Sequence, residues 1–171
     1  MEFSVRFAKQ TDQTSIAALY RRVAAEPGGI AREPDEITAE YINNNITKSL
    51  ENGVCLVIEN PDDANSLIAE IHCYKLTPRL FSHVLSELTI VVHPDFQNQK
   101  LGKLLFISLL DHVEKDRPDI RRVELIARES NKRAIAFYEK IGFRIEGRFE
   151  SRVDCGNGEF EADIPMAWLR V

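Results

Sequence analysis

The stretch VVHPDFQNQKLGKLLFISLLDHVEK, from Val91 to Lys115, decides the fold of this chain. In it an apolar strand turns through a short polar loop directly into a long apolar helix. The first turn of a helix leaves backbone N–H groups without intrahelical partners and carries the positive end of the helix dipole. We therefore expect the junction to bind an anion, most simply a phosphate group.

The loop carries residue types that suit such a site. Asn98 tolerates left-handed backbone angles, and Gly102 lets a ligand approach the backbone. Lys100 and Lys103 place positive charge where the phosphate would lie. The candidate set is Gln97, Asn98, Gln99, Lys100, Leu101, Gly102 and Lys103.

Two common phosphate loops are excluded by spacing. A P-loop needs G-x-x-x-x-G-K-[ST] and a dinucleotide fold needs G-x-G-x-x-G, whereas this loop has one glycine and neither pattern. It resembles the Q/R-x-x-G-x-G/A loop of the GNAT superfamily of acyl-CoA N-acyltransferases, with Gln97 first and Gly102 last. Lys100 replaces the first glycine of that pattern. A polar loop that merely precedes a helix is the alternative interpretation.

A second segment, NKRAIAFYEKIGF from Asn131 to Phe143, matches the pattern N-x-x-A-x-x-x-Y-x-K-x-G-F of the same family at every defined position. Its periodicity also predicts an amphipathic helix that begins at Ser130 or Asn131 and ends at Gly142. Periodicity alone leaves Tyr138 as a core aromatic residue. Two matching motifs in the right order make the resemblance to the GNAT superfamily strong.

Composition fits one soluble globular domain over residues 1–171. The hydrophobic fraction is 44% and no segment has 18 consecutive apolar residues, so we expect no membrane association. No secretory signal is visible at the N-terminus, and a cytoplasmic location follows as the default. The net charge of −5 disfavours nucleic-acid binding, which relies on basic surface.

The cysteines and histidines show no metal-binding pattern. Cys55, Cys73 and Cys155 are an odd number without C-x-x-C spacing, which argues against a disulfide framework and a zinc site. The four histidines also lack metal spacing. We predict no metal, and we expect Cys55 and Cys73 to pack as small hydrophobic residues.

Hydrophobic periodicity and turn residues predict the elements along the chain. Helices are expected from 11 or 12 to 25, from 34 or 35 to 50, over 101–115 and from 131. Strands are expected over 3–9, 54–59, 66–76, 84–93, 122–127, 143–153 and 160–169. This order resembles the GNAT fold: an α/β (α+β) domain with a mixed, mostly antiparallel sheet that is splayed in the middle and has helices on both faces.

The resemblance implies where acetyl-CoA would bind. In the family, the strands that correspond to residues 88–92 and 123–127 part and receive the pantetheine arm, whose amides pair with the freed backbone groups. The main chains of Ile90 and Val92 should do this here. Asn131 matches the asparagine that contacts the cofactor.

The resemblance also implies the catalytic residues. Tyr138 matches the tyrosine that donates its proton to the departing thiolate, and it also contacts the cofactor. A backbone N–H of Val92 or a neighbour would polarise the thioester carbonyl. Glu87 is the candidate base that takes a proton from the amine. His93, His83 or a chain of waters are weaker alternatives.

We therefore expect an N-acetyltransferase that moves an acetyl group from acetyl-CoA to a primary amine of a small amine, an amino acid or a peptide N-terminus. Residues 142–169 resemble the branch that includes ribosomal-protein N-terminal acetyltransferases. Acidic residues that suit a cationic amine lie in the regions that set acceptor specificity in the family: Glu26, Glu33, Asp35, Glu36, Glu150, Asp154, Glu159, Glu161 and Asp163. The alternatives are a different acyl-CoA donor or a noncatalytic acyl-CoA binding module, and a homodimer is left open.

Overall fold

The computed structural model describes residues 3–171. Its helices are α1 (Gln13–Ala24), α2 (Ala39–Asn52), α3 (Leu101–Asp116) and α4 (Lys132–Lys140). Its strands are β1 (Val5–Phe7), β2 (Gly53–Asn60), β3 (Asp63–Lys75), β4 (Val84–Val92), β5 (Arg122–Arg128), β6 (Arg144–Ile145), β7 (Phe149–Gly156) and β8 (Glu159–Leu169). Short 3-10 turns at 10–12, 34–36, 79–81 and 94–96 join some of them.

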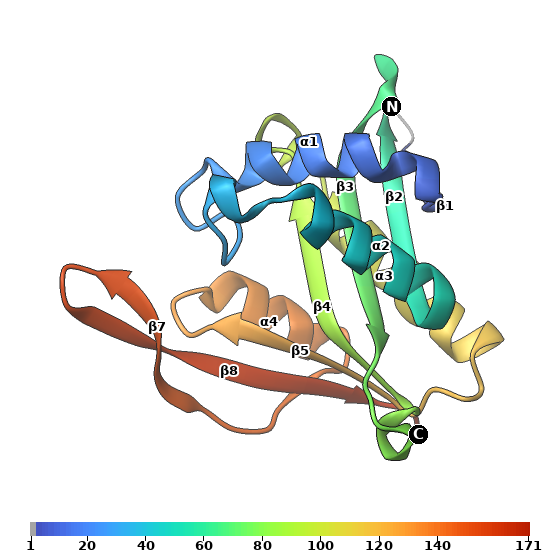
Figure 1. The fold of residues 1–171 in the computed structure, drawn as a ribbon. Coiled ribbons are helices and arrows are strands. Elements are labelled where there is room, and N and C mark those ends of the chain that lie inside the picture. The colour runs from blue at the N-terminus through green and yellow to red at the C-terminus, as the bar shows by residue number, and fades with distance from the viewer. Residues whose placement is uncertain (1–2) are drawn as a thin grey trace.

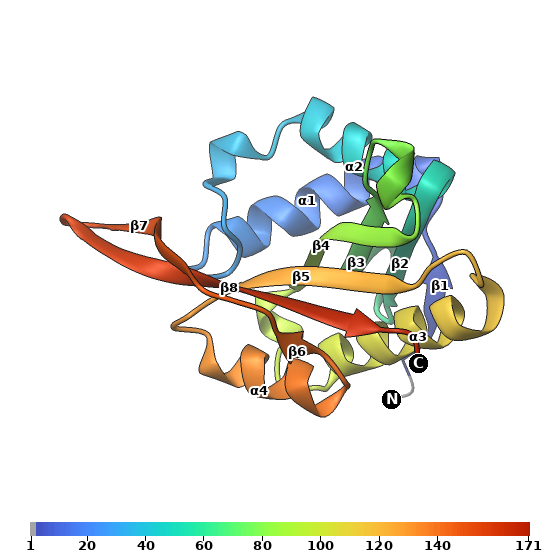
Figure 2. The ribbon, with the colours of Figure 1, turned by 90° about the horizontal axis from the view of Figure 1, so that it is seen from below.

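These strands form one sheet in the order β1-β2-β3-β4-β5-β8-β6, with β7 paired to β8. All neighbours are antiparallel except β4 and β5, which run parallel. Helices α1 and α2 cover one face and α3 and α4 the other (Figures 1 and 2). The predicted fold class is therefore confirmed.

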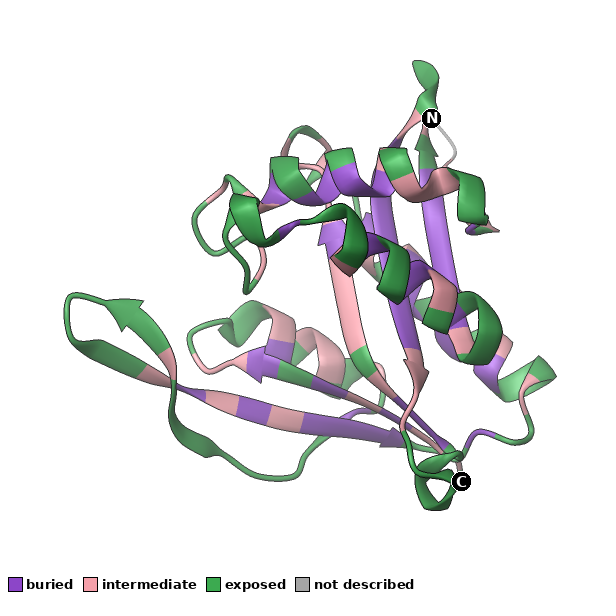
Figure 3. Cartoon of the chain, in the orientation of Figure 1, coloured by how far each residue is buried: buried purple, intermediate pink, exposed green. Residues whose placement is uncertain are grey.

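Each face of the sheet has its own apolar cluster. One lies under α3 and α4 and includes Leu105, Phe106 and Phe143, and the other lies under α1 and α2 and includes Ile16 and Ile42. The strands between them are buried on both faces, which explains the continuous apolar runs in the sequence. Beyond this body, the β7–β8 hairpin projects with β7 almost wholly exposed (Figure 3).

The sheet opens between β4 and β5. Only Val84 and Leu85 of β4 pair with β5, opposite Arg122 and Val123. Beyond Leu85 the two strands diverge, as Figure 1 shows. This confirms the predicted splay, although Val123 still belongs to the paired part.

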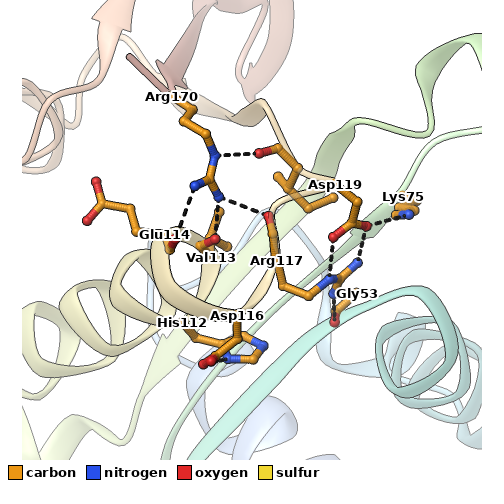
Figure 4. A network of polar contacts seen from close by, with 10 residues as sticks. Gly53, Lys75, His112, Val113, Glu114, Asp116, Arg117, Asp119 and Arg170 are labelled. Carbon is orange, nitrogen blue, oxygen red and sulfur yellow. Dashed lines mark hydrogen bonds and ion pairs between the residues drawn. The ribbon is translucent and has the colours of Figure 1, made fainter.

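A polar network holds the closed end of this opening (Figure 4). The Arg170 guanidinium donates to the carbonyl oxygens of Ile120 (2.8 Å), Arg117 (2.9 Å) and Glu114 (3.1 Å), and so satisfies the C-terminal end of α3. Arg117 in turn donates to the carbonyl oxygen of Gly53 at the start of β2 (3.0 Å). The end of α3 is thereby tied to the strands where β4 and β5 still pair.

The strand predicted over 143–153 is broken in two. Glu146 N–H donates to the carbonyl oxygen of Pro165 (3.0 Å), but Pro165 has no N–H to return the bond. The ladder between β6 and β8 therefore ends at Ile145, and pairing resumes only at Phe149 in β7.

The helix predicted from 34 or 35 to 50 is also divided. Pro34–Glu36 forms a 3-10 turn, and α2 begins after Thr38, whose hydroxyl accepts from Tyr41 N–H (3.0 Å). Helix α1 begins at Gln13, directly after the expected cap residue Asp12, but the Asp12 carboxylate binds Arg6 and Lys9 N–H instead of the helix amides. No helix within residues 3–171 is long and apolar enough to span a membrane.

Candidate active site

The loop before α3 has the geometry of an anion site. Asn98 and Lys100 both adopt left-handed backbone angles, with φ of 62° and 64°. Leu104 N–H makes the first helical hydrogen bond, to the carbonyl oxygen of Lys100 (3.0 Å), and no side chain caps the helix. The amides of residues 101–103 therefore precede the helical ladder and are available to a ligand.

A cavity of about 420 Å³, which we call the cofactor pocket, extends from this loop. It lies between the N-terminal end of α3, β4 and α4. Lys100, Lys103 and Arg133 line it, and none of the described residues in its wall is acidic. The wall also contains Ile90, Val91, Val92, Gln97, Asn98, Leu101, Gly102, Phe106, Phe137 and Tyr138. In a chain of net charge −5, this local excess of positive charge favours an anionic ligand.

Arg133 is a residue of this pocket that the sequence analysis did not select. It extends from the first turn of α4, and its Nη1 donates to Asn98 Oδ1 (3.1 Å). It occupies an undefined position of the Asn131–Phe143 pattern, so the motif gave no reason to choose it. Its location beside the loop could only be found from the way α4 packs next to α3.

The backbones of Ile90 and Val92 face the opening between β4 and β5. They lie opposite Ile71 and Ala69 of β3, and His93 N–H donates to the carbonyl oxygen of Ile68 (2.8 Å). Because antiparallel pairs alternate in hydrogen bonding, the N–H and C=O groups of positions 90 and 92 point away from β3. Since β5 has already diverged, it does not pair with them.

A second cavity of about 400 Å³, which we call the acceptor pocket, lies on the α1–α2 side of the same opening. Gly29, Ile90 and Tyr138 line both pockets, so the two meet there. The rest of the acceptor pocket comes from the loop after α1, from α2 and from strands β3, β4 and β5. Its polar and charged lining residues are Arg32, Tyr41, Asn44, Asn45, His72, Tyr74, Glu87, Thr89, Arg128 and Asn131.

Tyr138 is positioned by aromatic packing. Its ring contacts those of Phe106, Phe137 and Phe143, with centroids 5.1 to 6.1 Å apart. Burial raises the pKa of the Tyr138 hydroxyl to about 12. The group therefore stays protonated near neutral pH and can donate a hydrogen bond at the junction of the pockets.

Glu87 lies in the acceptor pocket at an irregular point of β4. His72 pairs with Thr89 and Tyr74 with Ser86, so two residues of β4 stand opposite one of β3. Glu87 is one of them and has a φ of 53°, a strained value for a non-glycine residue. This bulge turns Glu87 into the lining of the pocket. His83 and His93, the weaker candidate bases, do not line it.

The remaining candidates are less central. The side chain of Asn131 caps α4 by accepting from Ala134 N–H (3.2 Å), and it lines the acceptor pocket instead of the cofactor pocket. Gln99 lines neither pocket. Among residues 3–171 no group of three or more histidine, cysteine, aspartate or glutamate side chains could hold a metal ion, and the absence of a metal stays a prediction.

The acidic residues expected near the acceptor are mostly elsewhere. None of the nine lines the acceptor pocket, and only Asp163 lines the groove of about 590 Å³ that continues from it across β5 and β8. The charged lining of the acceptor pocket is instead Glu87 with Arg32 and Arg128. Any local attraction for a cationic amine therefore comes from Glu87.

Comparisons with known proteins agree with this geometry. The acetyltransferase (GNAT) family profile matches residues 16–143. The [ribosomal protein bS18]-alanine N-acetyltransferase of Escherichia coli K12 is 44% identical over 63 residues, which is 35% of this chain and 41% of that protein. The match thus spans less than half the length of this relative.

Solved structures share the whole fold at low identity. A ribosomal-protein-alanine N-acetyltransferase from Brucella melitensis superposes with a TM-score of 0.81 at 16% identity, covering 98% of this chain and 99% of that one. A phosphinothricin acetyltransferase from Sinorhizobium meliloti, solved in complex with AcCoA, gives 0.80 at 18% identity, covering 99% and 89%. The fold of this chain is therefore the fold of these acetyltransferase structures. The chain belongs to the acetyltransferase (GNAT) family.

Proposed function

We propose that this protein transfers an acetyl group from acetyl-CoA to a primary amine by direct attack. The observation that carries the proposal is that Ile90 and Tyr138 line both pockets, so a thioester from one and an amine from the other can meet beside them. Such positioning removes much of the entropic barrier of a two-substrate reaction.

Acetyl-CoA fits the cofactor pocket on chemical grounds. Its phosphates suit the free amides of residues 101–103 together with Lys103 and Arg133. The pocket wall comes close to the backbone at Gly102, where an added Cβ would lie 3.7 Å from Ile90 Cδ1 and 4.0 Å from Val92 Cγ2. The amides of the pantetheine arm suit the backbone groups of Ile90 and Val92, which β5 leaves unpaired.

The chain's own groups can serve each step of the transfer. A backbone N–H of β4 at or near Val92 would stabilise the negative charge that develops on the thioester oxygen. Glu87 would take a proton from the ammonium, directly or through water, which leaves the nitrogen its electron pair for attack. As the carbon–sulfur bond breaks, Tyr138 would donate its hydroxyl proton to the thiolate. The burial that raises the Tyr138 pKa would raise that of the thiol as well, which makes this transfer feasible.

The acceptor is a primary amine, and the groove beyond the acceptor pocket leaves room for one larger than a single amino acid. Glu87, Leu88, Thr89, Leu125, Ile126 and Arg128 belong to both cavities. The similarity to ribosomal-protein-alanine N-acetyltransferases supports a peptide N-terminus among the three amine classes considered.

Thiol release tests the proposal. Purified protein is incubated with acetyl-CoA and a panel of small amines, amino acids and short peptides, and free thiol is measured. Release that depends on an amine supports the enzyme. Binding of acetyl-CoA without thiol release across the panel would instead favour a noncatalytic acyl-CoA binding module. Faster thiol release from a longer acyl-CoA would identify that acyl-CoA as the donor in place of acetyl-CoA.

A further inference from the structure

A buried carboxylate network lies behind the acceptor pocket. Glu70 on β3 is 1% exposed, and its carboxylate accepts hydrogen bonds from Tyr20 Oη (2.6 Å), His72 Nδ1 (2.9 Å) and Cys55 Sγ (3.2 Å). A buried ionised carboxylate is costly unless donors surround it, and here three elements, α1, β2 and β3, supply them. Cys55 packs in the apolar cluster as predicted and is in addition a hydrogen-bond donor.

His72 is the member of this network that reaches the acceptor pocket. It lines that pocket although only 3% of it is exposed. Its Nδ1 is used within the network, whereas its Nε2 has no hydrogen-bond partner among the described residues. Within residues 3–171 the only buried side-chain nitrogen or oxygen without a partner is Ser49 Oγ. Nε2 is therefore not sealed in the core and must open onto the pocket.

The contacts of Glu70 decide which nitrogen of His72 carries the proton. Burial raises the pKa of both Tyr20 and Cys55 well above the usual values, so both groups stay protonated and donate to Glu70. The Tyr20 hydroxyl also lies 3.1 Å from Nδ1, but its one proton goes to Glu70 at 2.6 Å, so its oxygen can only accept from His72. A carboxylate likewise only accepts, so the contacts at Nδ1 require N–H there. Neutral His72 then has a free lone pair on Nε2, facing the space where the acceptor amine would lie.

We propose that His72 is the base that deprotonates the acceptor and that Glu70 is its positioning residue. This inference rests on the proposed function and replaces Glu87 by His72 in its deprotonation step. Nε2 forms a bond to one proton of the ammonium, the N–H bond breaks, and its electron pair remains on the nitrogen that attacks the thioester. The imidazolium is stabilised by the Glu70 carboxylate and returns its proton to solvent after the product leaves. Glu87, on the exposed side of the pocket, then attracts and orients the ammonium.

Several titratable or charged groups surround His72 and must be considered in any pH profile. They are Tyr20 from α1, Tyr41 from α2, Cys55 from β2, Glu70 and Tyr74 from β3, Glu87 from β4, Arg128 from β5, Tyr138 from α4 and Arg32 from the loop after α1.

The His72→Asn variant isolates Nε2. Asparagine can still donate an N–H to Glu70 from near the position of Nδ1, but it offers no base to the pocket. We expect kcat/KM for the amine to fall about 10²-fold or more near neutral pH, with partial recovery at high pH, where the amine loses its proton unaided. The thermal shift with acetyl-CoA should not change.

His112→Asn is the matched control. His112 Nδ1 makes the same type of contact, to Asp116 Oδ2 at 3.0 Å, but it lies on α3 and lines neither pocket. Its kcat/KM should equal that of the wild type.

Glu70→Gln and nitrogen NMR test the positioning role. Without the anionic partner the imidazolium is less stable, so the acidic limb of the kcat/KM profile should move to lower pH, whereas a purely structural role would lower Tm and leave the limb in place. Spectra of ¹⁵N-histidine protein should show the Nδ1–H tautomer for His72. The inference is overturned if the spectra show the Nε2–H tautomer. It is also overturned if the His72→Asn variant keeps the kcat/KM and the pH profile of the wild type. Failure of the proposed function would differ: the wild-type protein itself would release no thiol.

Discussion

Ile90 on β4 and Tyr138 on α4 border both the basic cofactor pocket and the acceptor pocket. The two residues come from opposite sides of the opening between β4 and β5, one from the strand and one from the helix that follows β5. A group that enters from either pocket therefore reaches the other beside the Tyr138 hydroxyl. This relationship makes the chemistry at that hydroxyl the most direct test of the site.

Tyr138→Phe removes the hydroxyl but keeps the ring that packs against Phe106 and Phe143. We expect kcat to fall roughly 10²- to 10⁴-fold while the affinity for acetyl-CoA changes little. Steady-state kinetics with separate acetyl-CoA titrations measure both. His112→Asn, which changes a residue that lines neither pocket, is the control and should be nearly silent. A Tyr138→Phe enzyme with full kcat in single-turnover experiments would remove Tyr138 as the acid.

The same residue gives a pH prediction for stability. Burial raises the folded-state pKa of Tyr138 from the usual 10.0 to about 12. Its contribution to folding is therefore complete below pH 10 and is lost as the pH rises from 10 to 12. The Tm of the wild type should therefore fall more steeply between pH 10 and 12 than the Tm of Tyr138→Phe. The other buried tyrosines and thiols are common to both proteins and affect both equally. Parallel declines would contradict the burial of the hydroxyl.

Glu87→Gln keeps the shape of the side chain and removes its charge. If Glu87 takes the proton, kcat/KM should fall most at low pH, where deprotonation of the amine is hardest. If it only attracts the ammonium, as the His72 inference requires, KM should rise with little change in the pH profile. Measuring kcat/KM for one amine between pH 6 and 9 separates the two roles. An enzyme unchanged in both parameters would exclude Glu87 from the site.

Gly102 tests the cofactor pocket through ligand-induced stability. Acetyl-CoA at about 100 times Kd should stabilise the wild type by roughly 2.7 kcal/mol, or roughly 5 to 10 °C in Tm. Gly102→Val should abolish this shift because its methyl groups project into the pocket beside Ile90 and Val92. Gly102→Ala adds only a Cβ at ordinary contact distance and should retain much of it. A full shift with the valine variant would place the ligand elsewhere.

Lys100 carries backbone strain at the position where the family loop pattern Q/R-x-x-G-x-G/A has its first glycine. Its φ of 64° costs on the order of 1 kcal/mol for a residue with a Cβ. Lys100→Gly removes that strain but makes the unfolded chain more flexible, so the free energy of unfolding should rise by about 0 to 1 kcal/mol. Affinity for acetyl-CoA should weaken only a few-fold through the lost charge. Urea unfolding and calorimetric titration measure the two effects, and a large loss of stability would contradict the strain.

The sequence by itself determined most of the secondary structure and the family. The periodicity of residues 101–116 and the motif from Asn131 to Phe143 are local signals, because helix caps, glycine dihedrals and buried faces depend on residues a few positions apart. The same locality explains why Asn98 could be expected to adopt left-handed angles, whereas Tyr138 was selected through the resemblance to the family motif. It also explains the error over 143–153: the strand breaks at Pro165, twenty residues away, on the strand that should have paired with it.

Only the tertiary structure decided which side chains share a pocket. Arg133 contacts the loop at Asn98, which lies 35 positions away in the sequence. His72 contacts Tyr20, which lies 52 positions away, and joins the network that also contains Cys55 and Glu70. Neither contact leaves a periodic pattern or a motif, since it depends on how α1 and α4 pack on the sheet. The opening between β4 and β5 is equally nonlocal, because it arises where two strands stop pairing, and it alone brings Glu87, Ile90 and Tyr138 to one place.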